Sequence, residues 1–250
     1  MMKKFLRITD RIFFFHFFTK IYQKFLISRV KRYLKNYPFY KKYKYKSQND
    51  EFSKLCEKYL TDKGGIEGNL GNRSFHFYSS FYNEYFQNKK KDIKLIFECG
   101  IGSINKEIQS NIAKKGATPG ASLRVLQDYF QNALIYAADI DRNVLFKDKR
   151  ISTHHVDQLN EQSIKDMWNK INKDNFDLII DDGLHTLKSA CTLFNLSFSK
   201  LRSKGIYVIE DVHVIYLIEL TKKLREFNPI IISSQKDHNI DDYLFVIEKD

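Results

Sequence analysis

The sequence contains few cysteines. Its 250 residues include three, which are an odd number without close spacing: Cys56, Cys99 and Cys191. Disulfide frameworks and structural zinc sites need closely spaced or paired cysteines, so neither is indicated. This cysteine usage is typical of a reducing compartment, and we expect a cytoplasmic protein.

Long uncharged segments are also missing. Charged residues such as Arg11, Lys20 and Lys24 interrupt the apolar N-terminal region, so it has no run of about 18 uncharged residues, the length that a membrane-spanning helix needs. The apolar run Ile12–Thr19 is short, and no small-residue cleavage site follows it. A cleavable signal peptide is therefore disfavoured.

Acidic residues are scarce in the first fifth of the chain. Residues 1–50 contain 14 Lys and Arg against two Asp, whereas residues 51–250 contain 28 basic and 28 acidic residues, so the whole net charge of +12 arises at the N-terminus. The same region is rich in Phe and Tyr. A basic, aromatic, helix-prone segment can lie in the surface of an anionic membrane. We therefore predict a peripheral membrane contact through residues 1–46, at the inner face of the membrane.

Other uses of this N-terminal segment stay open. It could pack on its own domain or on a second copy, which would make a homo-oligomer. The stretch Tyr37–Lys46 interleaves aromatic residues and lysines, a pattern typical of surfaces that stack nucleic-acid bases. The balanced charge of the remaining chain argues against a nucleic-acid enzyme.

The chain after the basic segment alternates strands and helices. Pro38 and the polar run Ser47–Asp50 mark a boundary, which gives a helical appendage over residues 1–50 and a domain over residues 51–250. Two helical pieces are expected within Phe52–Phe86, around the glycine-rich loop Gly64–Gly71. Strands are expected at Lys94–Cys99, Leu134–Asp139, Ile151–Val156, Phe176–Asp181, Ile206–Ile209, Ile230–Ser233 and Tyr243–Glu248, and helices at Ser163–Lys173, Thr186–Leu201 and Ile215–Phe227. The pattern predicts an α/β fold, with a Rossmann-like doubly wound sheet of about seven strands and a C-terminal antiparallel hairpin.

Four polar residues follow two of the predicted strands. Asp182 and His185 follow one strand, and Glu210 and Asp211 follow another. Parallel strands deliver their carboxyl ends to one crevice, so three carboxylates and an imidazole are expected to converge. Carboxylate oxygens suit Mg²⁺ or Mn²⁺, and a neutral His beside such an ion can take a proton from a hydroxyl that the ion acidifies. Helix capping or loop charge would explain each residue alone, but the combination favours a metal site.

A short glycine turn follows the first strand of the domain. Residues Phe97–Gly102 read Phe-Glu-Cys-Gly-Ile-Gly, and the third glycine of the dinucleotide fingerprint is missing. This short form is typical of sites for nucleosides that carry no pyrophosphate. Acidic residues Glu98, Asp139, Asp157 and Asp181 end successive strands. Asp139 is placed to accept both ribose hydroxyls, and Asp157 to accept an adenine amine.

With these motifs, the chain resembles class I S-adenosylmethionine-dependent methyltransferases. More narrowly, it resembles the metal-dependent sugar O-methyltransferases of the mycinamicin and tylosin pathways and related enzymes of bacterial surface-glycan clusters. The resemblance covers roughly residues 54–249. The matching segments are Phe97–Gly102, Pro119–Arg124, Asp128–Ala133, Ile135–Asp141, Val156–Gln158, Asp181–His185 and Ile209–Asp211.

The resemblance implies roles for individual residues. The metal ligands would be Asp182, Glu210 and Asp211, and His185 would be the general base. Apart from the resemblance, His213 is the next candidate for the base. S-adenosylmethionine would bind to Glu98, Gly100, Gly102, Ser122, Asp139, Asp157, Gln158 and Asp181. Upstream, Thr61–Gly64 and Asn69–Tyr78 resemble the element that covers the cofactor or acceptor pocket, with His76 and Tyr78 as candidate contacts.

The predicted activity is methyl transfer from S-adenosylmethionine to a sugar hydroxyl. The acceptor would be a nucleotide-activated sugar or a surface-glycan precursor, as in capsule polysaccharide biosynthesis. One alternative is methylation of a phosphate or phosphoramidate group on a glycan precursor. Another is a non-catalytic, membrane-associated nucleoside-binding protein, which should tolerate the loss of His185.

Overall fold

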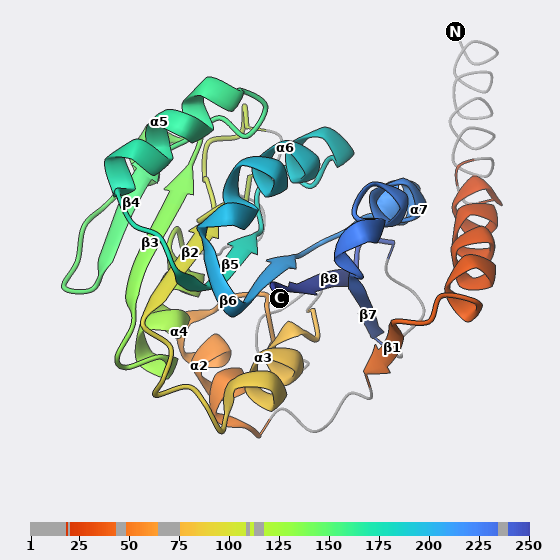
Figure 1. The fold of residues 1–250 in the computed structure, drawn as a ribbon, viewed down its shortest axis with the longest axis horizontal. Coiled ribbons are helices and arrows are strands. Elements are labelled where there is room, and N and C mark those ends of the chain that lie inside the picture. Colours follow the sequence, from red (N-terminus) through yellow and green to blue (C-terminus); the bar gives the residue numbers. More distant parts are fainter. Residues whose placement is uncertain are drawn as a thin grey trace, which may run out of the picture.

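The structure is a computed structural model, and it describes residues 19, 21–43, 49–64, 76–108, 111–112, 118–234 and 240–250. A single mixed sheet is covered by helices on both faces (Figure 1). Its strands are β1 (Tyr40–Tyr43), β2 (Leu95–Cys99), β3 (Leu134–Asp139), β4 (Ile151–His155), β5 (Phe176–Asp181), β6 (Leu201–Ile209), β7 (Ile230–Ser234) and β8 (Tyr243–Glu248). Residues 21–35 are helical, and the other helices are α2 (Glu51–Tyr59), α3 (Tyr78–Phe86), α4 (Ala121–Tyr129), α5 (Glu161–Ile171), α6 (Leu187–Ser197) and α7 (Val214–Lys223). Short 3₁₀ turns lie at η2 (Arg142–Val144), η3 (Phe198–Lys200) and η4 (Arg225–Phe227).

The strand order is β1-β7-β8-β6-β5-β2-β3-β4. Strand β8 runs antiparallel to both β6 and β7, and the other neighbouring pairs are parallel. The doubly wound sheet and its closing antiparallel hairpin are therefore confirmed. In this order, the carboxyl ends of β2, β3, β5 and β6 meet at one edge of the sheet, where an open α/β sheet binds its ligands.

The two faces of the sheet carry separate hydrophobic clusters. Helices α5, α6 and α7 pack on one face together with Val30 and Leu34, and α2, α3 and α4 pack on the other. Strand β5 is buried along its whole length, as expected of a central parallel strand. Its side chains alternate, so Ile179 joins the first cluster while Leu178 and Ile180 join the second.

The strands predicted from sequence are all present, and three of them have the predicted bounds. Strand β6 differs, because it begins at Leu201 and not at Ile206. Its added residues include exposed Ser203 and Lys204, which lack the apolar pattern of a core strand. The predicted loop Gly64–Gly71 lies outside the described residues, except for Gly64.

The eighth strand, β1, was not predicted. It lies within the expected appendage and pairs in parallel with β7, as an edge strand beside residues 231–234. The Tyr40 hydroxyl is 2.7 Å from the Ser233 hydroxyl, and the Tyr37 hydroxyl donates to the Pro229 carbonyl at 2.7 Å. Val30 and Leu34, one helical turn apart, are each only 2% exposed. This described part of the N-terminal segment thus packs on the domain that follows it.

Candidate active site

A cavity of about 640 Å³ opens at the carboxyl edge of the sheet. It is bordered by the β2 loop, the end of β3, the loop after β4 and the loops after β5 and β6. This volume lies within the range of small-molecule sites. Six of the eight predicted cofactor contacts line it: Gly100, Gly102, Ser122, Asp139, Asp157 and Gln158.

The glycine turn after β2 brings the backbone close to the next loop. Gly100 has φ +90° and donates its amide to the Ala138 carbonyl at 2.8 Å. A Cβ at this position would overlap the backbone carbonyl of Asp182. Only glycine therefore fits the turn, because both the left-handed conformation and the lack of space exclude a side chain.

Asp139, at the end of β3, is held by backbone amides. Its Oδ2 accepts from the Ile101 amide and its Oδ1 from the Asp141 amide, both at 2.9 Å. Burial raises the pKa of Asp139 above its ordinary value, while these amide bonds act in the opposite direction. Each carboxylate oxygen has a second lone pair, so the side chain is fixed and can still accept ligand hydroxyls.

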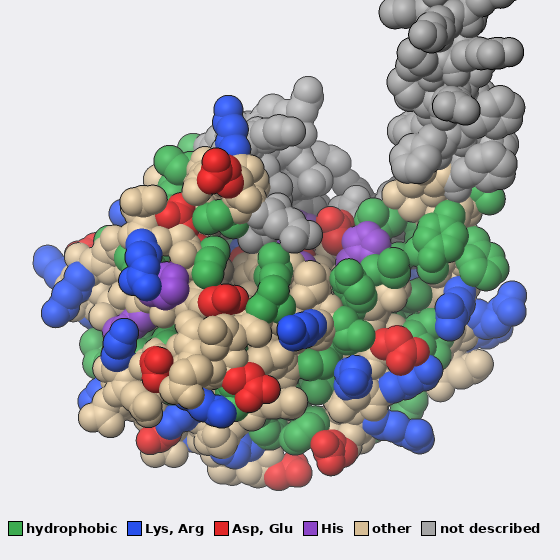
Figure 2. Space-filling view, turned by 90° about the horizontal axis from the view of Figure 1, so that it is seen from above, with side chains coloured by type: hydrophobic (Ala, Val, Ile, Leu, Met, Phe, Trp, Pro, Cys, Tyr) green, Lys and Arg blue, Asp and Glu red, His purple; other side chains and the backbone are tan. Residues whose placement is uncertain are grey.

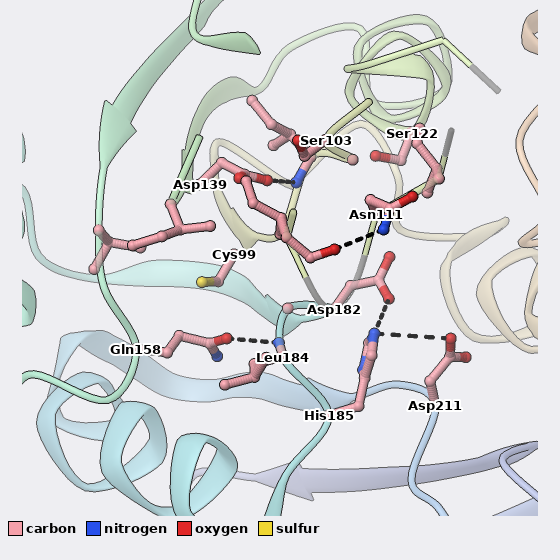
Figure 3. A pocket seen from close by; sticks show the side chains of 18 of the residues that line it. Cys99, Ser103, Asn111, Ser122, Asp139, Gln158, Asp182, Leu184, His185 and Asp211 are labelled. Atoms are coloured by element: carbon pink, nitrogen blue, oxygen red, sulfur yellow. Dashed lines mark hydrogen bonds and ion pairs between the residues drawn. The ribbon is translucent and has the colours of Figure 1, made fainter. Parts of the chain in front are cut away.

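Two predicted cofactor contacts, Glu98 and Asp181, do not line the cavity. Asp181 is 3% exposed, and its Oδ1 accepts from Gln158 Nε2 at 2.6 Å. Gln158 Oε1 in turn accepts from the Leu184 amide at 2.8 Å (Figure 3). Burial raises the pKa of Asp181 to about 6. These contacts brace the loop that carries Asp182 and His185, behind the wall of the cavity.

Asp182, His185 and Asp211 come together at one end of the cavity. His185 Nε2 lies 4.0 Å from Asp182 Oδ1 and 4.0 Å from Asp211 Oδ2 (Figure 3). These three side chains offer ligand atoms within 4.8 Å of one another. His185 and Asp211 both have positive φ values, 56° and 51°, which are uncommon for residues other than glycine. Such backbone outliers cluster at functional sites.

Glu210 lies outside this cluster, although it was expected to be the third metal ligand. It is 1% exposed, accepts from the Tyr82 hydroxyl at 2.5 Å and pairs with Lys63. Glu210 points away from the cavity because successive side chains along β6 point to opposite faces of the sheet. Val208 and Glu210 point toward the face covered by α3, whereas the left-handed turn at Asp211 directs the next side chain to the cavity. The structure therefore brings His185, and not Glu210, to the two aspartates.

Lys63 is a buried cation that no prediction assigned a role. Its Nζ lies 3.3 Å from Glu98 Oε1 and 2.7 Å from Asp182 Oδ2, and it also contacts Glu210. Burial alone would lower the pKa of Lys63, but the surrounding carboxylates, led by Asp182, raise it well above its ordinary value. Burial raises the pKa of Glu98 to about 7, against the opposing effect of Lys63. The only signal in the sequence was the position of this lysine in an element expected to cover the pocket.

His76 and Tyr78, the two candidates from the same element, both contact Asp211. The Tyr78 hydroxyl donates to Asp211 Oδ1 at 2.7 Å, and His76 Nε2 is 3.5 Å from the same oxygen. His76 Nδ1 lies 3.1 Å from Asp242 Oδ1. Burial would lower the pKa of His76, but Asp211 and Asp242 raise it to about 10. Burial also raises the pKa of Tyr78 well above its ordinary value, so its hydroxyl stays protonated.

His213, the alternative candidate for the base, has a structural role outside the cavity. It caps the N-terminus of α7, where its Nδ1 accepts from the Ile215 amide at 3.1 Å. It is not among the described residues that line the cavity. His185 is thus the better placed of the two histidines.

The fold is that of class I methyltransferases, and comparison with solved structures agrees. No family model matches the chain. Among solved structures, the MycE methyltransferase from the mycinamycin biosynthetic pathway, in complex with Mg, SAH and mycinamycin VI, aligns with a TM-score of 0.58 and 23% identity, over 81% of this chain and 56% of that one. This likeness shows the fold.

Two curated relatives are O-methyltransferases. The 8-demethyl-8-alpha-L-rhamnosyl tetracenomycin-C 2'-O-methyltransferase of Streptomyces olivaceus is 28% identical over 162 residues, 65% of this chain and 38% of the relative. The demethylmacrocin O-methyltransferase of Streptomyces fradiae is 28% identical over 170 residues, 68% of this chain and 38% of the relative. The chain thus spans less than half the length of either relative. The resemblance to macrolide sugar O-methyltransferases predicted from the motifs is confirmed.

Proposed function

We propose that this chain transfers a methyl group from S-adenosylmethionine to a hydroxyl group of a sugar, with Mg²⁺ or Mn²⁺ as a second cofactor. The observation that carries the proposal is the meeting of Asp182, His185 and Asp211 within 4.8 Å, in the same cavity as the glycine turn and Asp139. The names of the curated relatives support it, because both are O-methyltransferases and one of them is named for a rhamnosyl derivative.

The residues present fit a divalent ion. Asp182 Oδ1 and Asp211 Oδ2 are carboxylate oxygens of the kind that Mg²⁺ and Mn²⁺ prefer, and each faces the same imidazole nitrogen. Both aspartates would hold the ion. Glu210 would not bind the ion directly. It would support the site through Lys63, which contacts both Glu210 and Asp182.

The residues also fit a nucleoside cofactor. Gly100 leaves the backbone after β2 open to close approach, and Asp139 presents a fixed carboxylate at the end of the neighbouring strand. Asp157, Gln158 and Ser122 also line the cavity. These six cofactor contacts, including Gly102, keep their proposed role, whereas Glu98 and Asp181 would support the site from behind.

When bound, the cofactors would supply a methyl group on a sulfonium leaving group and a positive charge that acidifies the sugar hydroxyl. The chain itself supplies alignment and a base. His185 Nε2, between the two aspartates, would accept the hydroxyl proton. The bond from the Leu184 amide to Gln158 holds the loop that carries this histidine. Such alignment of reacting groups can contribute roughly 7–11 kcal/mol to the lowering of a barrier.

The phosphate-directed alternative has less support than sugar O-methylation. Asp62 and Asp241 line the cavity together with Asp182 and Asp211, and such carboxylates repel an anionic group. Lys63, His76 and the proposed metal act in the opposite direction, so charge alone does not select the acceptor. The preference for a hydroxyl rests on the names of the curated relatives, which are O-methyltransferases.

Incubation of the full chain with S-adenosylmethionine, Mg²⁺ and a panel of acceptors tests this function. The panel contains neutral glycosides, nucleotide-activated sugars and surface-glycan precursors, and mass spectrometry detects the mass gain of one methyl transfer. We expect at least one sugar to be methylated at a hydroxyl, and the His185→Ala variant to form far less of the same product. Methylation confined to a phosphate group would instead support the alternative, and cofactor binding without any product would support a binding protein.

We also propose that the basic N-terminal segment holds the enzyme against an anionic membrane surface in the cytoplasm, beside glycan assembly such as that of capsule polysaccharide. Residues 21–42 contain seven Lys and Arg, all exposed, and no Asp or Glu. Ile21, Tyr22, Phe25 and Phe39 are also exposed, and Figure 2 shows hydrophobic and basic side chains together at this end of the molecule. Each basic residue near an anionic surface contributes about 1 kcal/mol to binding. Much of residues 1–46 lies outside the described residues, and no described helix is long and apolar enough to cross a membrane.

Removal of the whole segment would also remove β1 and buried Val30, so substitutions give a cleaner test. The variant Lys24→Glu/Phe25→Ser should lose sedimentation with phosphatidylserine vesicles and keep methyl transfer. The control Leu134→Ser/Lys149→Glu, which changes exposed side chains of the same types elsewhere, should sediment like the unmodified chain. Equal sedimentation of all three proteins would contradict the membrane proposal.

A further inference from the structure

The two oxygens of the Asp211 carboxylate have different partners. Oδ1 accepts from the Tyr78 hydroxyl at 2.7 Å, whereas Oδ2 faces His185 Nε2 at 4.0 Å. The two oxygens of Asp182 also have different partners, because Lys63 contacts Oδ2 whereas Oδ1 faces His185. Each aspartate therefore directs one oxygen into the protein and one toward the place proposed for the metal.

Tyr78 contacts Asp211 at two points. Its hydroxyl donates to the carboxylate and also accepts from the Asp211 backbone amide at 3.1 Å. One hydroxyl thus links the main chain and the side chain of the same residue. It does so at a residue with φ 51°, a conformation that needs support from its surroundings.

Tyr78 is itself held rigidly. It is 1% exposed at the first position of α3, and its ring stacks on His76 at a centroid distance of 4.7 Å. His76 lies 3.5 Å from the same Asp211 oxygen and is anchored by Asp242. The element before β2 therefore reaches across the sheet edge and fixes a side chain that follows β6.

We propose that Tyr78 is a positioning residue for the metal site, which holds the Asp211 carboxylate so that only Oδ2 is offered to the divalent ion. The inference rests on the proposed metal-dependent function. Groups that orient a metal ligand through hydrogen bonds typically change metal affinity 10–100-fold when they are removed. The loss of a single hydroxyl should therefore weaken metal binding while the ligand carboxylate itself is unchanged.

Helix α3 offers a matched pair of variants. Tyr78→Phe removes the hydroxyl that contacts Asp211. Tyr85→Phe removes a hydroxyl from the same helix that donates to Glu248 at 3.1 Å, on an exposed part of the surface. Titration calorimetry measures the affinity of the full chain for Mn²⁺ and Mg²⁺. The affinity for SAH, the demethylated product of S-adenosylmethionine, is measured in parallel.

We expect Tyr78→Phe to bind the metal about 10–100-fold more weakly and to bind SAH normally, and Tyr85→Phe to bind both like the unmodified chain. The methylation rate of Tyr78→Phe should recover as Mg²⁺ is raised, which a general folding defect would not allow. If Tyr78→Phe does not fold, His76→Asn gives the second variant, because it withdraws the other contact to Oδ1 and should also weaken metal binding.

Two results would overturn the inference in distinguishable ways. Unchanged metal affinity in both Tyr78→Phe and His76→Asn, with an unmodified chain that binds Mg²⁺, would show that Asp211 needs no such support and would leave the proposed function intact. An unmodified chain that binds neither Mn²⁺ nor Mg²⁺ would remove the metal from the proposed function, and the inference with it.

Discussion

Replacement of Lys63 by methionine should destabilise the fold strongly. Methionine is unbranched and only one atom shorter than lysine, and it removes the charge, so Glu98 and Glu210 would remain buried without their cation. Both carboxylates are at most 1% exposed. Removal of one partner from a buried ion pair costs about 3–5 kcal/mol of unfolding free energy, because the other charge stays uncompensated.

The destabilisation by Lys63→Met should be larger at high pH. Glu98 has a pKa of about 7 in the folded chain, above its ordinary value of 4.5, so its contribution to stability is present at low pH and is lost as the pH rises toward 7. This rise in the pKa of Glu98 corresponds to about 3 kcal/mol of unfolding free energy, at about 1.4 kcal/mol per pKa unit. Because Lys63 lowers the pKa of Glu98, the variant should raise it further. The difference between variant and unmodified chain should therefore be greater at pH ~8 than at pH ~6.

Urea unfolding of metal-free protein at the two pH values measures this effect. The matched control is Lys58→Met, which breaks a pair with Asp128 at 2.8 Å in which the lysine is exposed. Exposed ion pairs contribute little to stability, so the control should unfold almost like the unmodified chain. If Lys63→Met lost no more stability than Lys58→Met at the higher pH, then Lys63 would not be compensating the buried carboxylates.

Three further variants test the proposed cofactor and base residues. Asp139→Ala should lower the binding free energy of SAH by about 1–3 kcal/mol through unpaired ribose hydroxyls, and unchanged calorimetric affinity would remove this assignment. Gly100→Ala should lose both SAH and Mg²⁺ binding, because its Cβ would displace the backbone at Asp182; normal binding of both ligands would show that the turn adapts. His185→Ala should lower kcat by roughly 10²–10⁴ with SAH affinity nearly intact, and a near-normal rate would assign the base elsewhere.

The position of polar residues at strand ends was the strongest sequence signal for the site. Apolar runs predicted the bounds of β2, β3 and β5 to within one residue, because each is a short, mostly buried segment bounded by polar residues. The rule that ligands meet carboxyl ends then placed Asp139, Asp182 and His185 at the cavity. These positions depend on local pattern and topology, which a single sequence contains.

Side-chain direction and long-range pairing were harder to predict. The alternation along β6 contains the signal that Glu210 points away from the cavity, but its partner Lys63 lies 147 residues earlier in the chain. Tyr78 is separated from Asp211 by 133 residues. Strand β1 was missed because its sequence, Tyr-Lys-Lys-Tyr, reads as a charged segment, and only the paired edge of β7 makes it a strand.

Dependence of methyl transfer on both a divalent ion and His185 tests the central claim most directly. The measurement is the rate of SAH formation with a methylated sugar as product, for the unmodified chain and for His185→Ala, after chelation and again after the addition of Mg²⁺. We expect no turnover after chelation, full recovery with Mg²⁺ in the unmodified chain, and little recovery in the variant. Full activity after exhaustive chelation, or equal rates in the two proteins, would contradict the account of this site.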